Sequence, residues 1–246
     1  MELTLPRPRR WILVPVALAV VAVVARIVLA RRAGRARVRD DQQPADVGFM
    51  RAMHDAMRRD LDRLDAVAPR LANLAEVPKE VLSGWTAFRD ELRFHHEAED
   101  DDLWPVLRQH LVDAADQREV DAMVEEHREI PAAIDAVDDA FAQHQDAATP
   151  ARNLAALVRD HLEHEERTVL PLLEQHLSRA EWHRFLLTER GRRAPSARPG
   201  FLTWVLDDAG EDDRAAVMAE LPRPARVVYR VALRPRYERE HRWRVA

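Results

Sequence analysis

Apolar residues recur every three or four positions along most of the chain, which is the spacing of amphipathic helices. The pattern predicts long helices over residues 45–64, 78–111, 113–143 and 149–177, and Pro105 should kink or interrupt the second of them. Helices of this length joined by short connections are typical of an antiparallel bundle. We therefore predict an all-α protein whose centre is an antiparallel up-down four-helix bundle.

Shorter helices are predicted after the bundle. Ser178 and Glu181 have the spacing of a capping box, so a fifth helix should begin at Ser178 and end near Gly191. Residues 191–200 have the composition of a loop, and residues 201–233 predict two or three short helices before a charged tail. We expect this region to form a C-terminal helical extension of the bundle.

A different pattern marks the N-terminus, where the 20 residues 11–30 are apolar except for Arg26. A segment of this length without a polar face can cross the hydrocarbon core as a helix. A cleaved signal peptide and a buried core helix are the alternatives, but two arginines follow the apolar stretch directly. Three arginines precede it and five follow it, which favours a cytoplasmic body. We expect a single-pass protein of the cell membrane, with a cytoplasmic protein as the alternative.

Charge separates this segment from the rest of the chain. Residues 1–40 carry nine arginines against two acidic residues, a net charge of +7, whereas the remainder carries 29 basic and 41 acidic residues, a net charge of −12. An acidic body argues against nucleic-acid binding, which needs a basic surface. The predicted parts are a basic N-terminus (1–10), a transmembrane helix (11–30), a linker (31–44), the bundle (45–185) and the extension with its tail (186–246).

Composition limits the chemistry that the chain can perform. It contains no cysteine, which excludes disulfides, thiolate metal sites and cysteine nucleophiles, and it has no glycine-rich phosphate-binding loop. It does contain 11 histidines. A metal site in this protein would therefore be built from imidazole and carboxylate ligands.

An internal repeat arranges such ligands. When residues 95–118 are aligned with residues 161–184, at an offset of 66 residues, 10 pairs are identical, among them His95 with His161 and Glu99 with Glu165. The first and third helices also correspond, because apolar residues lie at the same distances from His54 and His127. These residues are Met50, Met57, Leu61 and Leu64 in one helix and Met123, Ile130, Ile134 and Val137 in the other. A histidine within such a stripe points toward the core, so the bundle looks like two copies of one helical hairpin.

Each His-x-x-x-Glu pair places an imidazole and a carboxylate on one face of a helix, one turn apart. Facing helices would bring the two pairs together, and one histidine from each of the other helices would join them. Buried carboxylates without a cation would repel one another and lose their hydration, and metal ions remove both penalties. We predict a dimetal site with six ligands: His54, His95, Glu99, His127, His161 and Glu165.

The ligand count favours iron as the metal. Four histidines supply two nitrogens to each of two metals, and two bridging glutamates with an oxo or hydroxo bridge bring each metal to five ligands. One octahedral position then stays open for a small molecule, which suits iron. Zinc prefers four ligands and would be over-supplied by this set.

The motifs H-x2-M-R at His54, H-x3-E followed by L-W-P at His95, E-E-H-R at His127 and H-x3-E-E followed by L-P at His161 resemble those of the hemerythrin-like (HHE) cation-binding domain. The resemblance covers roughly residues 45–185. It implies a non-heme di-iron centre, with an oxo- or hydroxo-bridged iron pair, that handles O2, nitric oxide or peroxide. The C-terminal region also resembles an extension of actinobacterial members.

The chain departs from the oxygen-carrying hemerythrins in the third helix, because Met123 and Pro131 lie four residues before and after His127. No second histidine is present there. The resemblance therefore favours the four-histidine, two-glutamate members, which are linked to nitric oxide or redox stress and to iron handling. His96 and His164 stay open as sources of a fifth nitrogen ligand.

Two further alternatives stay open. Some family members use a carboxylate five residues after the histidine, so Glu166 competes with Glu165, which we prefer because the repeat pairs it with Glu99. The protein could bind a small gaseous ligand as a sensor, act as a di-iron peroxidase or oxidase, or serve as a metal-dependent module that recruits an unidentified protein partner.

Overall fold

The computed structural model describes residues 43–72, 74, 76–192, 198–219, 221 and 223–245. Apart from one isolated bridge between Pro44 and Ser178, regular structure in these residues is helical, so the predicted all-α class is confirmed for them. The predicted transmembrane helix, and almost all of the linker after it, lie outside the described residues. Within the described ranges, no helix combines the length and apolar character needed to span a bilayer.

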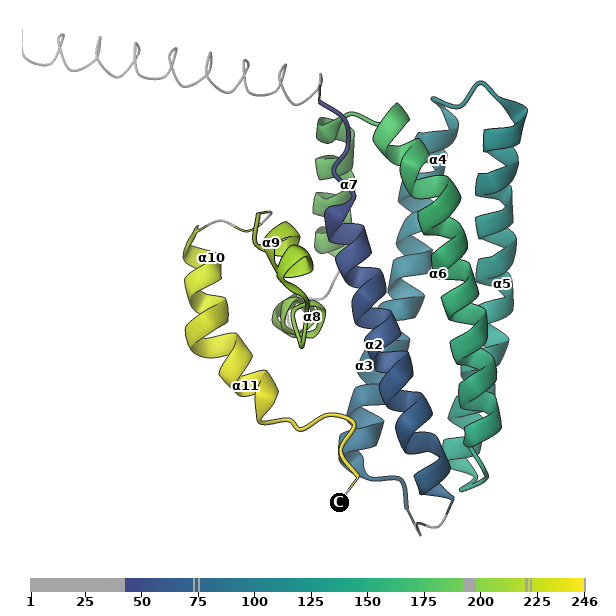
Figure 1. The fold of residues 1–246 in the computed structure, drawn as a ribbon, viewed down its shortest axis with the longest axis vertical. Coiled ribbons are helices and arrows are strands. Elements are labelled where there is room, and N and C mark those ends of the chain that lie inside the picture. The colour runs from purple at the N-terminus through teal and green to yellow at the C-terminus, as the bar shows by residue number, and fades with distance from the viewer. Residues whose placement is uncertain are drawn as a thin grey trace, which may run out of the picture. The chain divides into compact units, whose positions relative to one another are not determined.

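Long helices lie side by side and form the bundle: α2 (Gly48–Leu71), α3 (Lys79–Ala98), α5 (Ala114–Ala142) and α6 (Ala148–His176). Helix α2 packs against α3 and α6, and α5 packs against the same two helices, as Figure 1 shows. The apolar stripes predicted around His54 and His127 are buried between them. The first helix was expected to end at Leu64, but it continues for two turns because Val67, Ala68 and Leu71 are also buried.

The second predicted helix is divided into three parts. Helix α3 is followed by the π-helix η1 (Glu99–Leu103) and then by α4 (Trp104–Arg108). The predicted interruption at Pro105 is thus confirmed, and it takes the form of a π-helical turn just before the proline. Pro171, its counterpart in the repeat, leaves α6 α-helical throughout. π-helical turns inside helices are frequent at functional sites, and η1 begins with the predicted metal ligand Glu99.

Local signals place the ends of two helices correctly and one incorrectly. Helix α7 (Arg179–Arg192) follows the predicted capping box, in which the Ser178 backbone N–H donates to Glu181 Oε2 at 2.9 Å. The Asp113 side chain caps α5. Helix α6 was expected to begin at Thr149, but it begins one residue earlier, and the N–H of its first residue donates to Asp146 Oδ1 at 2.9 Å.

The C-terminal extension contains α8 (Arg198–Val205), α9 (Glu211–Ala219), α10 (Arg223–Val228), the π-helix η2 (Tyr229–Leu233) and α11 (Arg234–Glu238). Helices α8 and α9 pack on α2, and the continuous rod from α10 to α11 lies outside α8 (Figure 1). The extension therefore covers the side of the bundle formed by α2.

A buried carboxylate attaches the extension to the bundle. Asp60 on α2 is 1% exposed, and its two oxygens accept hydrogen bonds from Trp204 Nε1 at 2.7 Å and from Trp243 Nε1 at 3.0 Å. Arg63 donates to the same carboxylate at 3.0 Å. Trp243 lies over Gly84 of α3, so the end of the chain touches both helices. Three donors compensate for the lost hydration of this charge.

Candidate metal centre

Four of the predicted ligands meet in one small volume. His54 comes from α2, His95 from α3, Glu99 from the start of η1 and Glu165 from α6. Each offers a ligand atom, and these atoms lie within 4.8 Å of one another. Exposure of the four residues is 0–2%, so the group is closed off from bulk water. His95 and Glu99 stay on the same face of the helix, because the change from α- to π-helix begins only at Glu99.

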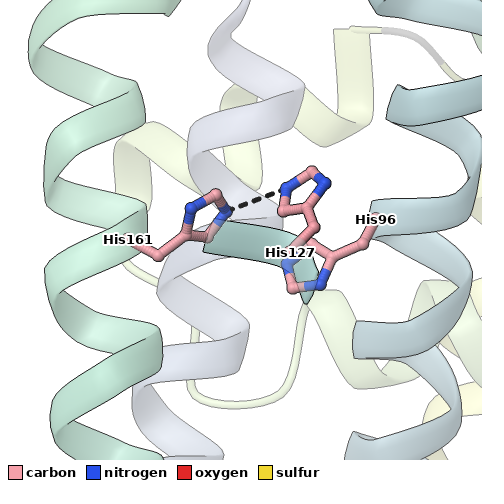
Figure 2. A group of neighbouring side chains, drawn as sticks. All are labelled: His96, His127 and His161. Carbon is pink, nitrogen blue, oxygen red and sulfur yellow. Dashed lines mark hydrogen bonds between the residues drawn. The ribbon is translucent and has the colours of Figure 1, made fainter. Parts of the chain in front are cut away.

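Three histidines form a second group beside the first, again with ligand atoms within 4.8 Å of one another: His96, His127 and His161. In Figure 2 the rings of His96 and His127 are stacked, with centroids 4.1 Å apart, and His161 points at them from α6. Nε2 of His127 lies 3.2 Å from Nε2 of His161. The structure thus brings all six predicted residues into the two groups, and His96 joins them.

Glu99 links the two groups. One of its oxygens lies 3.3 Å from Nε2 of His95 in the first group, and the other lies 3.6 Å from Nε2 of His127 in the second. Its side chain is fully buried. A carboxylate with one oxygen toward each group has the position of a bridging ligand, whereas Glu165 faces His54 at 3.2 Å.

A further set of carboxylates contacts the outer nitrogens of three of the predicted ligand histidines. Nδ1 of His54 lies 2.9 Å from Glu166, Nδ1 of His127 lies 2.9 Å from Asp100, and Nδ1 of His161 lies 2.8 Å from Glu126. An ionised carboxylate can only accept a hydrogen bond, so each Nδ1 carries the proton. Nε2 is then the nitrogen of each ring that can coordinate a metal, and it faces inward. Carboxylate–histidine pairs of this kind orient the ligands of metal sites.

The contacts of Glu166, His96 and His164 bear on the alternatives that the sequence left open. Glu166 lies outside the first group, where it accepts hydrogen bonds from His54 and from Arg58 at 2.8 Å. His164 also lies outside both groups, because its nitrogens contact Glu126 at 2.6 Å and Glu119 at 3.1 Å. Of the two candidates for a fifth nitrogen, His96 is therefore the one beside the predicted ligands.

Burial and neighbouring charges set the protonation of the first group. Burial lowers the pKa of His54, but the carboxylates of Glu165 and Glu166 outweigh it and raise the pKa to about 9. Burial together with the charge of Glu165 raises the pKa of Glu99 well above its ordinary value. The pKa of Glu165 is lowered, because His54 and other histidines outweigh its burial. Without a metal, protons thus compensate for part of the charge of this site.

Two histidines of the second group, His96 and His161, favour the neutral form. Burial and the neighbouring histidines lower the pKa of His96 well below 6.5. Burial also lowers the pKa of His161, and the hydrogen bond with Glu126, which by itself would raise this pKa, does not offset the effect of burial. A neutral ring with its proton on Nδ1 presents a lone pair at Nε2, which a metal cation can bind.

Buried oxygen and nitrogen atoms without hydrogen-bond partners also indicate that the site is suited to metal ions. Among the described residues, none forms a hydrogen bond with the four carboxylate oxygens of Glu99 and Glu165, although both side chains are completely buried, and none with Nε2 of His96. Buried polar atoms normally have partners, and a buried carboxylate without one is costly. Cations among these atoms would satisfy oxygens and nitrogens together.

The chain matches the family model for the hemerythrin HHE cation binding domain over residues 45–173. It belongs to this family. Comparisons with curated proteins and with solved structures each return no match. The family match ends within α6, so α7 and the extension lie beyond it. Family membership and the His/Glu groups together point to metal binding in this bundle, and they favour iron as the metal.

The sequence missed two contributors to the hemerythrin site. Asp100 lies in the acidic run that follows His96, and its carboxylate contacts His127. Glu126 precedes His127 in the chain, and its carboxylate contacts His161. The only signal available for either was an acidic residue directly beside a proposed ligand, and that signal is common on helices.

Proposed function

We propose that this hemerythrin-family protein binds two iron ions in its bundle and uses them to bind or react with a small ligand such as O2, nitric oxide or peroxide. The observation that supports it best is the position of Glu99, whose oxygens face ligands of both groups. Two neighbouring cations need a shared anion of this kind, because it reduces the repulsion between them.

The two groups offer different donors. The group of His54 supplies two nitrogens and two carboxylates, and the group of His96 supplies three nitrogens, to which Glu99 adds an oxygen. Imidazole and carboxylate donors suit iron, and four protein donors around an octahedral ion leave positions for an external ligand. Zinc accepts about four ligands and would leave none. Iron therefore fits both the donors and the proposed ligand chemistry.

Bound iron would supply the redox and ligand-binding chemistry. The residues around it have separate tasks. Glu166, Asp100 and Glu126 accept hydrogen bonds from Nδ1–H of three histidines and thereby keep each Nε2 directed inward. The almost complete burial of the ligand residues excludes bulk water and strengthens the attraction between carboxylates and cations.

Metal analysis of the purified chain tests the proposal. Protein loaded with Fe(II) without oxygen and then oxidised should contain about two irons per chain and show an absorption band of an oxygen-bridged iron pair. Glu99→Ala and His161→Ala should lose the band. Glu163→Ala is the matched control, because it lies on the same helix with a side chain that is 75% exposed and should leave the band unchanged. A folded protein that takes up no iron would end the proposal.

The same preparation separates the candidate roles. Steady consumption of hydrogen peroxide by the iron-loaded protein, lost in Glu99→Ala, would identify a peroxidase. Stoichiometric binding of nitric oxide or O2 without turnover would identify a binding protein or sensor. Both outcomes keep the iron pair and differ only in what the open positions do.

We further propose that residues 11–30 anchor the protein in the cell membrane with the bundle on the cytoplasmic side. The support is the sequence alone: an apolar stretch of 20 residues, with three arginines before it and five after it. Fractionation followed by protease treatment of intact and opened cells tests both points. Recovery of all the protein in the soluble fraction would exclude the anchor.

A further inference from the structure

The outer rod of the extension, α10–η2–α11, has one buried and one exposed face. Tyr229 and Tyr237 are buried, 3% and 9% exposed, and they face the rest of the extension. They are eight residues apart, which is more than two α-helical turns. The π-helical turn η2 takes up the additional residue, so both tyrosines stay on the inner side.

The outer side of this rod combines valines with arginines. Val227, Val228 and Val231 are 58%, 49% and 71% exposed, which is unusual for three valines so close together. Arg223, Arg230 and Arg234 are exposed at helical spacing from them. We call these six residues the valine–arginine face.

The rod is strongly basic on an acidic protein. Residues 223–239 contain six arginines and one glutamate, whereas the chain after residue 40 has a net charge of −12. Among the described residues, Arg223 and Arg230 form no ion pair, and Arg234 pairs with Glu238 at 2.8 Å. The positive charge of this face is therefore directed mainly at the surroundings.

We propose that the valine–arginine face docks on the anionic headgroup surface of a lipid bilayer. An amphipathic helix at such a surface places small apolar side chains at the boundary of the acyl chains, while arginines contact the phosphates. A bilayer with anionic lipids meets both halves of this face at once. The apolar segment and the arginines predicted at the N-terminus give independent reason to expect the chain beside a membrane.

This inference goes beyond the metal chemistry and does not depend on it. Failure to bind iron would leave the valine–arginine face as it is, and failure to dock would leave both ligand groups intact. An acidic protein, or the acidic bundle of a second copy, would be attracted by the same arginines. The test therefore separates lipid from protein.

Labelling at a single position of the full chain provides the test, because the natural chain has no cysteine. Val231→Cys carries an environment-sensitive fluorophore, and Leu187→Cys on α7, where the native side chain is 67% exposed, is the matched control. Both proteins are added to vesicles of phosphatidylcholine alone and to vesicles with phosphatidylglycerol. We expect the probe at position 231 to enter an apolar environment only with phosphatidylglycerol, and the probe at position 187 to show no change.

Charge removal tests the electrostatic part. Each arginine near an anionic bilayer changes the docking equilibrium by about fivefold, so Arg223→Gln, Arg230→Gln and Arg234→Gln together should weaken docking roughly 100-fold. The control replaces three exposed arginines elsewhere: Arg70, Arg118 and Arg152. High salt should weaken docking of the unaltered face as well.

Three results would overturn the proposal. One is an unchanged probe on phosphatidylglycerol vesicles, and another is an equal response to both kinds of vesicle. The third is a response that grows with protein concentration in the absence of lipid, which would assign the face to contact between copies of the chain.

Discussion

Nδ1 of His54 lies 2.9 Å from a carboxylate oxygen of Glu166, the residue that follows the proposed ligand Glu165. Glu165 places an oxygen 3.2 Å from Nε2 of the same ring. Two consecutive glutamates thus contact opposite nitrogens of one imidazole. Glu99 and Asp100 repeat this division at His127, where Glu99 lies near Nε2 and Asp100 near Nδ1. The internal repeat therefore preserves the outer carboxylates as well as the inner ones.

This division predicts different effects for two neighbouring substitutions. Glu166→Gln should keep two irons per chain and weaken their binding about 10- to 100-fold, because the amide still accepts from Nδ1 but carries no charge. Glu165→Gln removes a charged oxygen from the first group and should lower the iron content itself. Metal analysis and competition with a chelator measure the two effects. The opposite ranking would make Glu166 the ligand.

Iron binding should strengthen as the pH rises. In the metal-free protein the pKa of His54 is raised to about 9 against 6.5 ordinarily, so at pH 7 a metal must displace its proton. From this group alone the affinity should rise about tenfold per pH unit until about pH 9. Calorimetry in buffers with different ionisation enthalpies should detect release of at least one proton at pH 7. A pH-independent affinity would contradict the assignment.

The fold without metal should show the opposite dependence on pH. A histidine whose pKa is raised in the folded state stabilises that state fully below its unfolded pKa of 6.5, and the contribution is lost as the pH rises through about 9. Metal-free protein should therefore unfold at lower urea concentration at pH 9 than at pH 6.5. Glu166→Gln is the control, because it removes one of the carboxylates that raise the pKa and should flatten this difference.

His96 should act through its nitrogen as well as its ring. His96→Phe preserves a ring stacked on His127, whose centroid lies 4.1 Å away, but removes the donor atom from the second group. We expect the iron content to fall toward one per chain while the fold is retained. His164→Phe is the matched control, because the ring nitrogens of His164 contact Glu126 and Glu119, which lie outside both groups. Equal iron contents of the two variants would remove His96 from the site.

The sequence predicted six ligand candidates because each helical pair follows a fixed rule. Residues four apart share a face, and the repeat supplied that relationship twice. His96 follows no such rule. It lies next to His95, about 100° around the helix, so its direction matters only once the position of α5 is known. Asp100 and Glu126 likewise reach histidines on neighbouring helices, and their contacts depend on how those helices are rotated.

The sequence also did not predict which of the two repeated helices contains a π-helical turn. Pro105 and Pro171 occupy equivalent positions of the repeat, yet a π-helical turn precedes only Pro105. Helix α7 packs against η1, and Arg192 pairs with Asp101 and Asp102 at 3.1 Å. These partners come from outside the repeat. Local sequence identity therefore predicted the prolines but not the geometry around each of them.

The attachment of the extension should depend on Asp60. Asp60→Ala leaves two indole N–H groups and Arg63 without their acceptor in a buried place, and we expect a loss of about 3 kcal/mol in the free energy of unfolding. Asp62→Ala, on the same helix but 73% exposed, should change stability by less than about 1 kcal/mol. Urea denaturation measures both, and limited proteolysis should release the extension only in the Asp60 variant. Equal stabilities would show that the carboxylate does not hold it.

Gly84 and Trp243 should show strong coupling. A Cβ atom at position 84 would lie 2.6 Å from ring atoms of Trp243, so Gly84→Ala must displace the indole and should cost about 1–3 kcal/mol. In a Trp243→Ala background the obstacle is absent. Gly84→Ala should then stabilise the protein by about 0.5–1 kcal/mol, because alanine favours a helix more than glycine does. Gly191→Ala, whose added Cβ lies within 4 Å of no atom in the described part of the chain, controls for the helical preference alone. A double-mutant cycle measures the coupling, and additive effects would place the indole elsewhere in solution.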